Sequence, residues 1–254
     1  MNNIVMKPKE HFDIIAENYE VLRPVFTPVM DNLAKLLEIK ENDVVVDYGC
    51  GPGHDIKYLA DNYKINPIGL DKSKEMCRVA SLKIGENNVI NGGNLSYLHN
   101  VNFDKIYFKF VLHHISQPIQ FVDDLISRLK KGNRFAIVTM LPSHIESYEI
   151  LKYFPSLKPL LEIRAQEQQE VFEYLEQNEQ ISFHTLECDV NDEIFNEFLV
   201  KKLEYNYASI FSILTANEKK QGIERIKSQI NTKYNHKYLT KGVIGYGGKI
   251  DIRE

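Results

Sequence analysis

The sequence predicts an α/β fold in which helices cover both faces of a mostly parallel sheet. The hydrophobic period alternates along the chain between short β-rich runs and longer helical patterns, and the β-rich runs are nearly continuous in Val, Ile and Leu. Continuous apolar strands separated by helices are typical of parallel sheets that are buried on both faces. The 254 residues are enough for one large domain, and no internal repeat or low-complexity segment divides them.

Five strands are expected in the first 142 residues, because five short apolar runs there are bounded by turn residues. Helical patterns follow the first, second and fourth runs. Ser73 is a candidate N-cap for the second helix, and Gly132 is a natural stop after the third, which is expected over 118–131. The strands are expected at 43–48, 67–70, 88–91, 103–110 and 134–141.

The pattern after Pro142 is mainly helical. A helical stretch punctuated by Pro155 and Pro159 continues to about residue 180, and its part from 162 to 179 carries a run of glutamates against the single cation Arg164. Charge runs of this kind usually face water, so we interpret this one as a solvated helix face. The pattern is completed by a strand at about 181–190, a helical region from 193 to about 230 and a final strand near 241–250.

The composition argues against several classes of partner. Lys and Arg number 31 and Asp and Glu 35, which gives a net charge of −4 and no global positive field for a nucleic-acid backbone. Three widely spaced cysteines without a CxxC pair, and histidines without a ligand-like spacing, indicate neither a disulfide framework nor a metal site. The longest apolar run, about 135–141, is far shorter than the roughly 20 residues of a membrane span, and the expected location is cytoplasmic.

A glycine-rich loop follows the first strand and opens the first helix. The segment Asp47-Tyr48-Gly49-Cys50-Gly51-Pro52-Gly53 offers backbone without side chains, which a nucleotide-type ligand needs at this position. Its spacing differs from the dinucleotide fingerprint GxGxxG, because the sixth position is His54 and the third glycine comes one residue early. The loop also lacks the GK[ST] ending of nucleotide triphosphatases. A pyrophosphate or triphosphate ligand is therefore disfavoured.

Two carboxylates flank this loop in the predicted fold. Asp47 comes directly before it and suits a ligand that carries an ammonium group. Asp71 comes at the end of the next strand, at the spacing where an acid accepts hydrogen bonds from ribose hydroxyls. Together they favour a cationic adenosine derivative without phosphate. S-adenosylmethionine has this chemistry, because it carries an α-amino group, a sulfonium and a ribose.

From about residue 12 to residue 141 the chain resembles the class I S-adenosylmethionine-dependent methyltransferases, and their small-molecule branch in particular. The first motif of that family is similar to VVVDYGCGPG, its ribose-binding segment to IGLDKSKEM and its adenine-binding turn to GGNLSYL. Its fourth strand, following helix and fifth strand are similar to DKIYFKFVLHHI and FVDDLISRLKKGNRFAIV. The resemblance implies a Rossmann-like, mostly parallel seven-stranded sheet with helices on both faces and a helical insertion after the fifth strand.

The resemblance also implies a set of cofactor-binding residues. The methionine portion would lie against Asp47 and the glycine loop, and the ribose against Asp71. Asn94 would meet the adenine edge, where the family commonly has Asp. The segment AENYEVLRP is similar to a helix that closes over the cofactor in the family, with Tyr19 against the methionine or sulfonium and Arg23 paired with its carboxylate. The full set is Tyr19, Arg23, Asp47, Gly49, Gly51, Asp71, Lys72, Met76, Asn94, Leu95 and Phe108.

The candidate catalytic residues are His113 and His114, which follow the fourth strand at the edge where the acceptor would lie. Methyl transfer from a sulfonium is an in-line displacement of an activated leaving group, so a base is needed only when the acceptor must lose a proton. The alternative is that this LHH segment only packs and hydrogen-bonds within its loop. Lys109 could attract an anionic substrate or remain solvated, and Asp55 is interpreted as a first-turn charge on the helix dipole.

These observations predict one domain, residues 1–254, that transfers a methyl group from S-adenosylmethionine to an O, N or C atom of a small-molecule acceptor and releases S-adenosylhomocysteine. An RNA or protein methyltransferase and a non-catalytic S-adenosylmethionine-binding protein are the alternatives, and an NAD-dependent dehydrogenase is disfavoured by the loop spacing. Neither nucleic acid nor a membrane is an expected partner. The expected parts are an N-terminal helical cover at about 1–40, a cofactor-binding core at about 41–142, a helical insertion forming the acceptor lid at about 143–180, and the last strands and helices at about 181–254.

Overall fold

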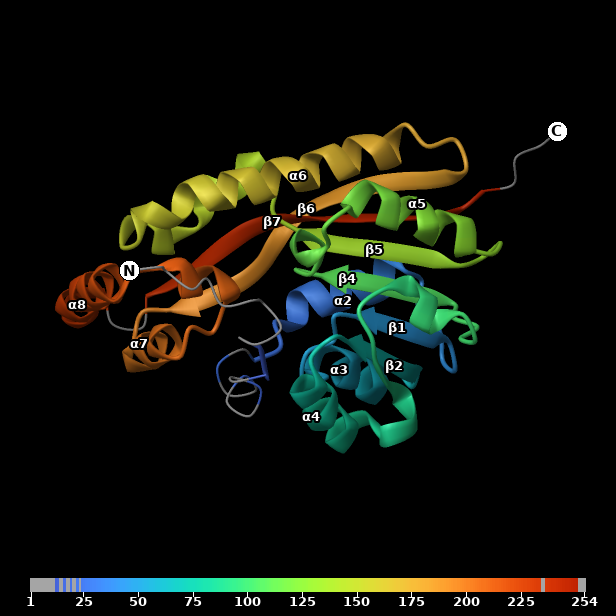
Figure 1. Ribbon diagram of the computed structural model, residues 1–254, viewed down its shortest axis with the longest axis horizontal. Helices are drawn as coiled ribbons and strands as arrows, with labels where there is room; N and C mark the ends of the chain where they lie inside the picture. Colours follow the sequence, from blue (N-terminus) through green and yellow to red (C-terminus); the bar gives the residue numbers. More distant parts are fainter. Residues whose placement is uncertain are drawn as a thin grey trace.

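A seven-stranded sheet forms the centre of the protein in a computed structural model, which describes residues 12, 13, 16, 19, 22, 24–233 and 236–250 (Figure 1). The strand order is β3-β2-β1-β4-β5-β7-β6. The first five strands are parallel, whereas β7 is antiparallel to both β5 and β6. This arrangement confirms the predicted mostly parallel sheet. The strands are β1 (Val44–Tyr48), β2 (Asn66–Asp71), β3 (Val89–Asn91), β4 (Lys105–Lys109), β5 (Arg134–Thr139), β6 (Ile181–Ile194) and β7 (Lys237–Lys249).

Helices cover both faces of this sheet (Figure 1). Side chains of α5 and α6 share one core with the sheet, and side chains of α2 and α3 share a second core on the opposite face. Helix α4 packs against α3, β2 and β3. The helices are α2 (Thr27–Leu36), α3 (His54–Tyr63), α4 (Lys74–Ile84), α5 (Pro118–Arg128), α6 (Lys158–Glu176), α7 (Glu197–Glu204) and α8 (Ala216–Lys233).

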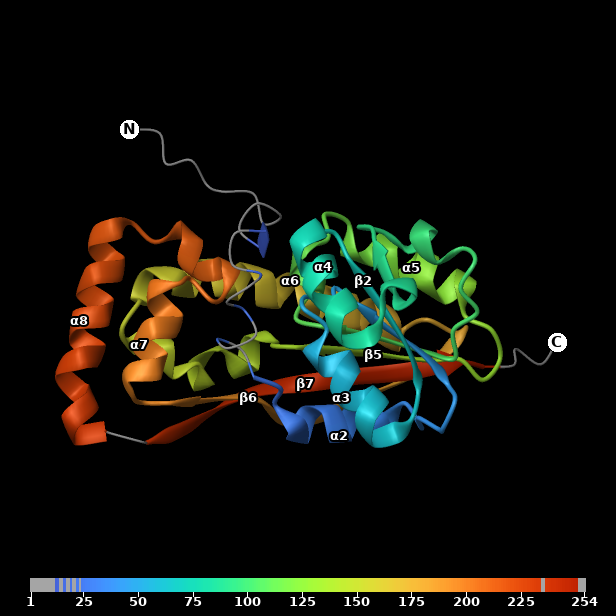
Figure 2. The same cartoon turned by 90° about the horizontal axis from the view of Figure 1, so that it is seen from below.

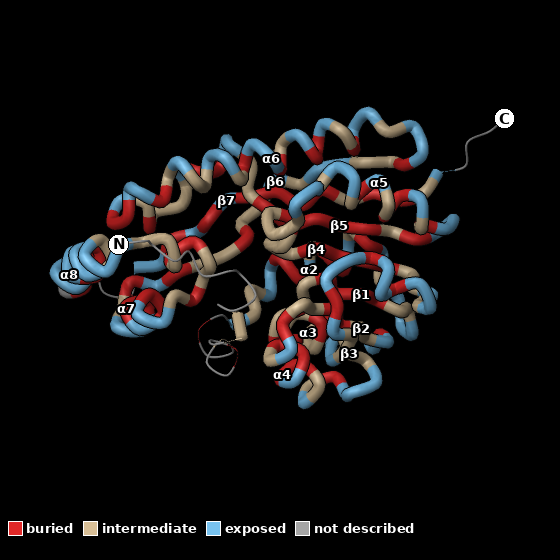
Figure 3. The backbone as a smooth tube through the Cα atoms, viewed as in Figure 1, coloured by how far each residue is buried: buried red, intermediate tan, exposed pale blue. Residues whose placement is uncertain are grey.

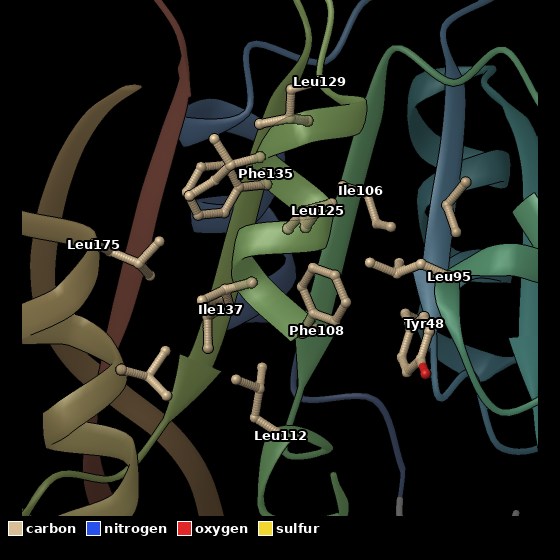
Figure 4. Close-up of a cluster of buried hydrophobic side chains, with 14 of the residues drawn as sticks. Tyr48, Leu95, Ile106, Phe108, Leu112, Leu125, Leu129, Phe135, Ile137 and Leu175 are labelled. Carbon is tan, nitrogen blue, oxygen red and sulfur yellow. The ribbon is translucent and has the colours of Figure 1, made fainter. Parts of the chain in front are cut away.

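Strand alternation divides neighbouring residues between the two faces. In β1, Val46 and Tyr48 join the core under α5, while Val45 joins the core under α2 and α3. Figure 4 shows Tyr48 and Phe108 on the α5 side of β1 and β4. Because successive side chains point to opposite faces, one residue of shift would move every one of them to the other core, and the register is therefore strongly specified.

Local signals in the sequence explain where the helices begin. The hydroxyl oxygen of Ser73 accepts a hydrogen bond from Met76 N at 3.1 Å, so the predicted N-cap of α4 is confirmed. Pro118 occupies the first turn of α5, where its missing N–H costs nothing. Helix α5 ends at Arg128, and Gly132 follows in the loop with a φ of +87°.

The last two strands are longer than the sequence predicts. We expected strands at 181–190 and 241–250, but the pair extends to Ile194 and begins at Lys237. We also predicted a helical region from 193, but residues 189–193 lie in β6, where β7 supplies lysines that pair with the acidic side chains. Lys241 pairs with Asp189 at 2.7 Å, and Lys237 pairs with Asp192 at 2.8 Å. The register shifts between Asp189 and Asn191, which places a β-bulge at this point.

The extended ends of β6 and β7 support a separate helical lobe. We use this name for α7, α8, the 3₁₀ helices η5 (Glu149–Lys152), η6 (Pro155–Leu157) and η7 (Ser209–Ile213), and the strand ends that pack with them. Figure 2 shows α7 and α8 at the end of the molecule opposite the C-terminus. The lobe has its own hydrophobic core, which includes Phe154, Phe195, Leu203, Phe211 and Ile226. Figure 3 shows buried residues in this lobe and in the sheet, and exposed residues on the outer faces of the helices.

The lobe draws on both sides of β6 in the sequence. The expected lid at 143–180 contributes η5 and η6, whereas α7, η7 and α8 come from the segment that we predicted as last strands and helices. The sequence boundary at 180 therefore cuts through one packed unit. In the described part of the chain, no helix is both long enough and apolar enough to cross a membrane.

Candidate functional site

A cavity of about 260 Å³ lies at the carboxyl edge of the parallel strands. Its wall includes residues directly after β1, β2, β3, β4 and β5, which is where open α/β sheets bind ligands. The antiparallel β7 places its N-terminal end at this same edge, and so brings the helical lobe to the cavity. Residues of α6, β6, η7 and β7 complete the wall.

The glycine loop after β1 forms one side of the cavity in a conformation that only glycine tolerates. Gly49, Gly51 and Gly53 have φ values of +80°, +51° and +78°, in the left-handed region. A Cβ on Gly49 would lie 2.5 Å from Cγ2 of Val111, so the space for a side chain is also missing. The loop is held to β2, because Gly49 N donates a hydrogen bond to Leu70 O at 2.7 Å.

Asp71 lies beside this loop in the cavity wall, as the sequence predicts. Its Oδ2 accepts a hydrogen bond from Gly51 N at 2.9 Å, and its Oδ1 accepts one from Ser73 N at 2.8 Å. Burial raises the pKa of Asp71, although both hydrogen bonds oppose the shift. Lys72 follows in the wall, and burial lowers its pKa. The carboxylate thus fixes the loop and faces the cavity.

Asp47 lies behind the glycine loop and does not form part of the cavity wall. Its side chain is 3% exposed, and it points to the face that β1 shares with α2 and α3. Burial, followed by the nearby Asp55 charge, raises the pKa of Asp47 well above its ordinary value. The structure therefore brings Asp47 close to the loop but not into contact with the cavity.

Three further predicted cofactor-binding residues lie outside the wall. Asn94 accepts a hydrogen bond from Ser96 N at 3.0 Å and caps the short 3₁₀ helix η2 (Leu95–Leu98). Leu95 and Phe108 are buried in the core under α5 (Figure 4). Phe108 does not flank the cavity, because strand alternation turns it toward α5 and leaves this edge to Lys109 and Phe110. On the adenine side, the backbone at Gly92 and Gly93 lines the cavity, and the Tyr48 hydroxyl donates to Gly93 O at 2.8 Å.

The N-terminal residues that the structure describes contribute aromatic rings to the wall. Tyr19 and Met76 both line the cavity. The Tyr19 ring meets Phe12 edge-on, with 6.1 Å between ring centroids. Arg23 lies outside the described residues.

His113 and His114 both reach the cavity from the 3₁₀ helix η3 (Leu112–His114), directly after β4. Their ring centroids are 4.1 Å apart, and the His114 ring contacts Phe12 edge-on at 5.7 Å. The preceding Phe110 has a φ of +54°, a conformation that is strained for a bulky side chain and is found mainly at functional sites. The two histidines predicted as catalytic thus lie together at the cavity.

Lys109 and Asp55 form an ion pair in the cavity wall. The Lys109 Nζ lies 2.7 Å from Asp55 Oδ2, and the side chains are only 13% and 23% exposed. Asp55 is in the first turn of α3, where its charge also interacts favourably with the helix dipole. The pair ties the end of β4 to the start of α3, so Lys109 is neither solvated nor available as an unpaired cation.

Several wall residues have no counterpart among the residues predicted from the sequence. Tyr148, Arg164, Asn191, Ser209 and Thr240 come from the second half of the chain. The sequence offered one signal for Arg164, namely that it is the single cation in a run of glutamates. The glutamates of this run are exposed, as predicted for a solvated helix face, whereas Arg164 is half-buried at the cavity. Over the described residues, no group of three His, Cys, Asp or Glu side chains could hold a metal ion.

Comparisons with known proteins agree with this geometry. A family model described as "Methyltransferase domain" matches residues 21–188, more than half of the chain. A protein MJ1252 of Methanocaldococcus jannaschii is 33% identical over 108 residues, which are 42% of this chain and 41% of that protein. Trans-aconitate 2-methyltransferase of Rhizobium rhizogenes is 25% identical over 133 residues, 50% and 52% of the two chains. The matched segments thus span about half the length of these relatives or less.

Two solved structures share the fold. A putative methyltransferase from an antibiotic biosynthesis pathway of Anabaena variabilis has a TM-score of 0.67 at 16% identity, with 90% of this chain and 99% of that chain covered. A methyltransferase from Geobacter sulfurreducens in complex with S-adenosylhomocysteine has a TM-score of 0.57 at 14% identity, with 95% and 99% covered. At these identities the likeness concerns the fold alone.

Proposed function

Because the chain belongs to the methyltransferase-domain family, within the class I S-adenosylmethionine-dependent methyltransferases, we propose that it transfers the methyl group of S-adenosylmethionine to a small-molecule acceptor. The observation that carries this proposal is the glycine loop beside Asp71. Three left-handed glycines leave backbone without side chains along the cavity, and a Cβ at Gly51 would meet only the Tyr19 ring, at 4.0 Å. A carboxylate at the end of β2 borders this backbone, as ribose hydroxyls require.

The cavity wall fits the parts of this cofactor in order along the strand ends. The methionine portion would lie over Gly49 and Gly51, with the Tyr19 ring close to the sulfonium. Asp71 would accept hydrogen bonds from the ribose, and the backbone at Gly92 and Gly93 would meet the adenine. Asp47 would act through the loop from behind, since it lies near the loop but outside the wall.

The chemistry asks little of the protein beyond alignment. When bound, the cofactor supplies a methyl carbon attached to a sulfonium that is already a good leaving group. The residues around the cavity would hold an acceptor atom in line with that carbon and exclude water. His113 or His114 would take a proton at a ring nitrogen when the acceptor is a hydroxyl or a protonated amine. These two residues are the ones that we propose as catalytic.

Two features favour a small acceptor over a macromolecular one. Residues of α6 and the helical lobe form one side of the cavity, and its volume is near the size range of small-ligand sites. The net charge of −4 provides no overall attraction for RNA or DNA. One relative, trans-aconitate 2-methyltransferase, bears a small-molecule acceptor in its name. We propose the same class of acceptor here, a lid role for the helical lobe, and the cytoplasm as location.

Isothermal titration with S-adenosylmethionine, S-adenosylhomocysteine and NAD tests the cofactor. We expect the first two compounds to bind and NAD not to bind, and binding of NAD alone would overturn the proposal. Incubation of metabolite extracts with isotopically labelled methyl donor then tests transfer. A labelled small molecule is expected. Cofactor binding without any labelled product would instead identify a non-catalytic binding protein, and label in RNA or protein would identify a macromolecular acceptor.

A further inference from the structure

The part of the cavity wall built by α6, the β6–β7 bulge and η7 has a different character from the glycine-loop side. It is largely apolar, with Leu161, Val190 and Ile210, and it contains one cation, Arg164. Helix α6 packs against η3, the segment that carries His113 and His114. This wall therefore lies on the acceptor side of the proposed reaction.

Arg164 differs from the other cations of the cavity because its charge has no ion-pair partner. Lys109 is paired with Asp55, and Lys72 adjoins the Asp71 carboxylate. Arg164 makes no ion pair or hydrogen bond with the residues that the structure describes. The one carboxylate that acts on it electrostatically is the exposed Glu167 on the next turn of α6. Burial lowers the pKa of Arg164, but a guanidinium remains charged in proteins at neutral pH.

A second polar group of the same region also has no protein partner. Thr240 on β7 is 3% exposed and lines the cavity, and its Oγ1 makes no hydrogen bond within the described parts of the chain. It lies across from Asn191 at the bulge of β6, a device that re-aims side chains next to sites. A buried hydroxyl without a partner is costly, and a ligand oxygen would satisfy it.

We propose that the acceptor is a small organic carboxylic acid. Arg164 holds its carboxylate in a bidentate ion pair, and Thr240 donates a hydrogen bond to it. This inference rests on the proposed function and names the substrate class for the same site. The guanidinium fork matches the two oxygens of a carboxylate, and one unpaired cation balances one negative charge. A phosphate monoester carries nearly two charges at neutral pH and would leave one unbalanced here. The apolar residues of the wall hold the carbon skeleton.

The test compares matched ligands by calorimetry on the protein saturated with S-adenosylhomocysteine, so that no turnover occurs. The probes are benzoate, phenylacetate and glutarate, each with its carboxamide, and phenyl phosphate. At least one carboxylate is expected to bind ten-fold or more tightly than its amide. Arg164→Gln should abolish this preference, Arg164→Lys should retain part of it, and Thr240→Val should weaken carboxylate binding several-fold. Arg128→Gln on α5, an arginine paired with Asp124 away from the cavity, is the control and should change nothing.

Equal binding of acids and amides, no binding of any acid, or a preference that survives in Arg164→Gln would each overturn the proposal. If phenyl phosphate bound more tightly than every carboxylate, the carboxylic-acid proposal would be overturned and a phosphate ester would be indicated as the acceptor. Titration of S-adenosylhomocysteine into the wild-type protein and every variant distinguishes a failure of the carboxylate proposal from a failure of the proposed function. Failure of the wild-type protein to bind that compound contradicts the methyltransferase proposal, and the same probe series on the cofactor-free protein then decides the anion preference by itself.

Discussion

At the scale of residues, the glycines with a left-handed backbone come first, because other residues adopt that conformation only with strain. Gly49 and Gly132 have nearly the same φ, +80° and +87°, but very different surroundings. A Cβ on Gly49 would meet Cγ2 of Val111 at 2.5 Å, whereas a Cβ on Gly132 would meet nothing within 4 Å. The two glycines therefore separate the cost of backbone strain alone from the cost of strain together with displacement of Val111 from the cavity wall.

We expect Gly132→Ala to lower the free energy of unfolding by about 1 to 2 kcal/mol, the cost of a left-handed L-residue, and to leave S-adenosylmethionine binding intact. Gly49→Ala should lower stability further and weaken binding, because its methyl group would displace Val111, which lines the cavity. Urea denaturation and calorimetric titration measure the two effects. Wild-type affinity in folded Gly49→Ala would contradict the assignment of the glycine loop to cofactor binding.

Asp71 provides the second prediction at this scale. Its carboxylate is expected to accept from the ribose, so Asp71→Ala should weaken S-adenosylmethionine binding by about 1 to 3 kcal/mol, the range for hydrogen bonds to charged groups. Because burial raises the pKa of Asp71, acidification protonates it sooner than an ordinary aspartate. Affinity should therefore fall as the pH is lowered, and it should fall less in Asp71→Asn. A dissociation constant that Asp71→Ala leaves unchanged would reject the ribose role.

At the scale of elements, the end of β4 and the start of α3 are joined by the Lys109–Asp55 pair. The two side chains are mostly buried, so their interaction is screened less than that of a surface pair. Lys57 and Asp61 form a matched pair on the same helix, but both are well exposed. The comparison isolates the effect of the cavity environment.

A double-mutant cycle with Lys109→Met and Asp55→Asn should give a coupling free energy of about 0.5 to 3 kcal/mol. The same cycle with Lys57→Met and Asp61→Asn should give about 0.3 to 0.5 kcal/mol, as for exposed helix pairs. Chemical denaturation of each set of variants measures both values. Equal coupling in the two cycles would show that the Lys109–Asp55 pair contributes no more than a surface pair.

Elements whose signals are local in the sequence were predictable. The five parallel strands follow from apolar runs, and the loop at 47–53 with Asp71 follows from residues that lie close to one another along the chain. Phe108 was misplaced because the position of a strand does not say which of its alternating side chains faces a site. Arg164 and Thr240 were not predictable, because the packing of α6 against η3 and the long β6–β7 pair bring them to the cavity from distant segments.

At the scale of the whole molecule, the described residues form hydrophobic cores with two different tasks. The cores on the two sides of the sheet hold the glycine loop and Asp71, while the lobe core holds η7 and the ends of β6 and β7 against the acceptor side. A defect in the lobe core should therefore affect the acceptor more than the cofactor. A buried ion pair inside the lobe allows this division to be tested.

Glu193 and Lys202 form that pair, with Lys202 Nζ 2.7 and 2.8 Å from the two carboxylate oxygens. Their side chains are only 2% and 6% exposed, and the same ammonium lies 4.7 Å from the centroid of the Tyr207 ring. Removal of one partner leaves an uncompensated buried charge, which typically costs 3 to 5 kcal/mol. Replacement of both partners by apolar residues of similar volume is often neutral, because the desolvation cost disappears along with the attraction.

We therefore expect Lys202→Met to lower the free energy of unfolding by about 3 to 5 kcal/mol, and Glu193→Leu with Lys202→Met to recover most of that loss. Lys201→Met is the matched control, since Lys201 is the exposed neighbour on the same helix, and it should cost no more than about 0.5 kcal/mol. In every variant that folds, S-adenosylmethionine affinity should stay within about two-fold of wild type, because neither Glu193 nor Lys202 lines the cavity. Denaturation and calorimetry measure both quantities. If Lys202→Met lost cofactor affinity as well as stability, the lobe core would be coupled to the cores of the sheet. The lobe would then contribute to cofactor binding as well as to acceptor binding.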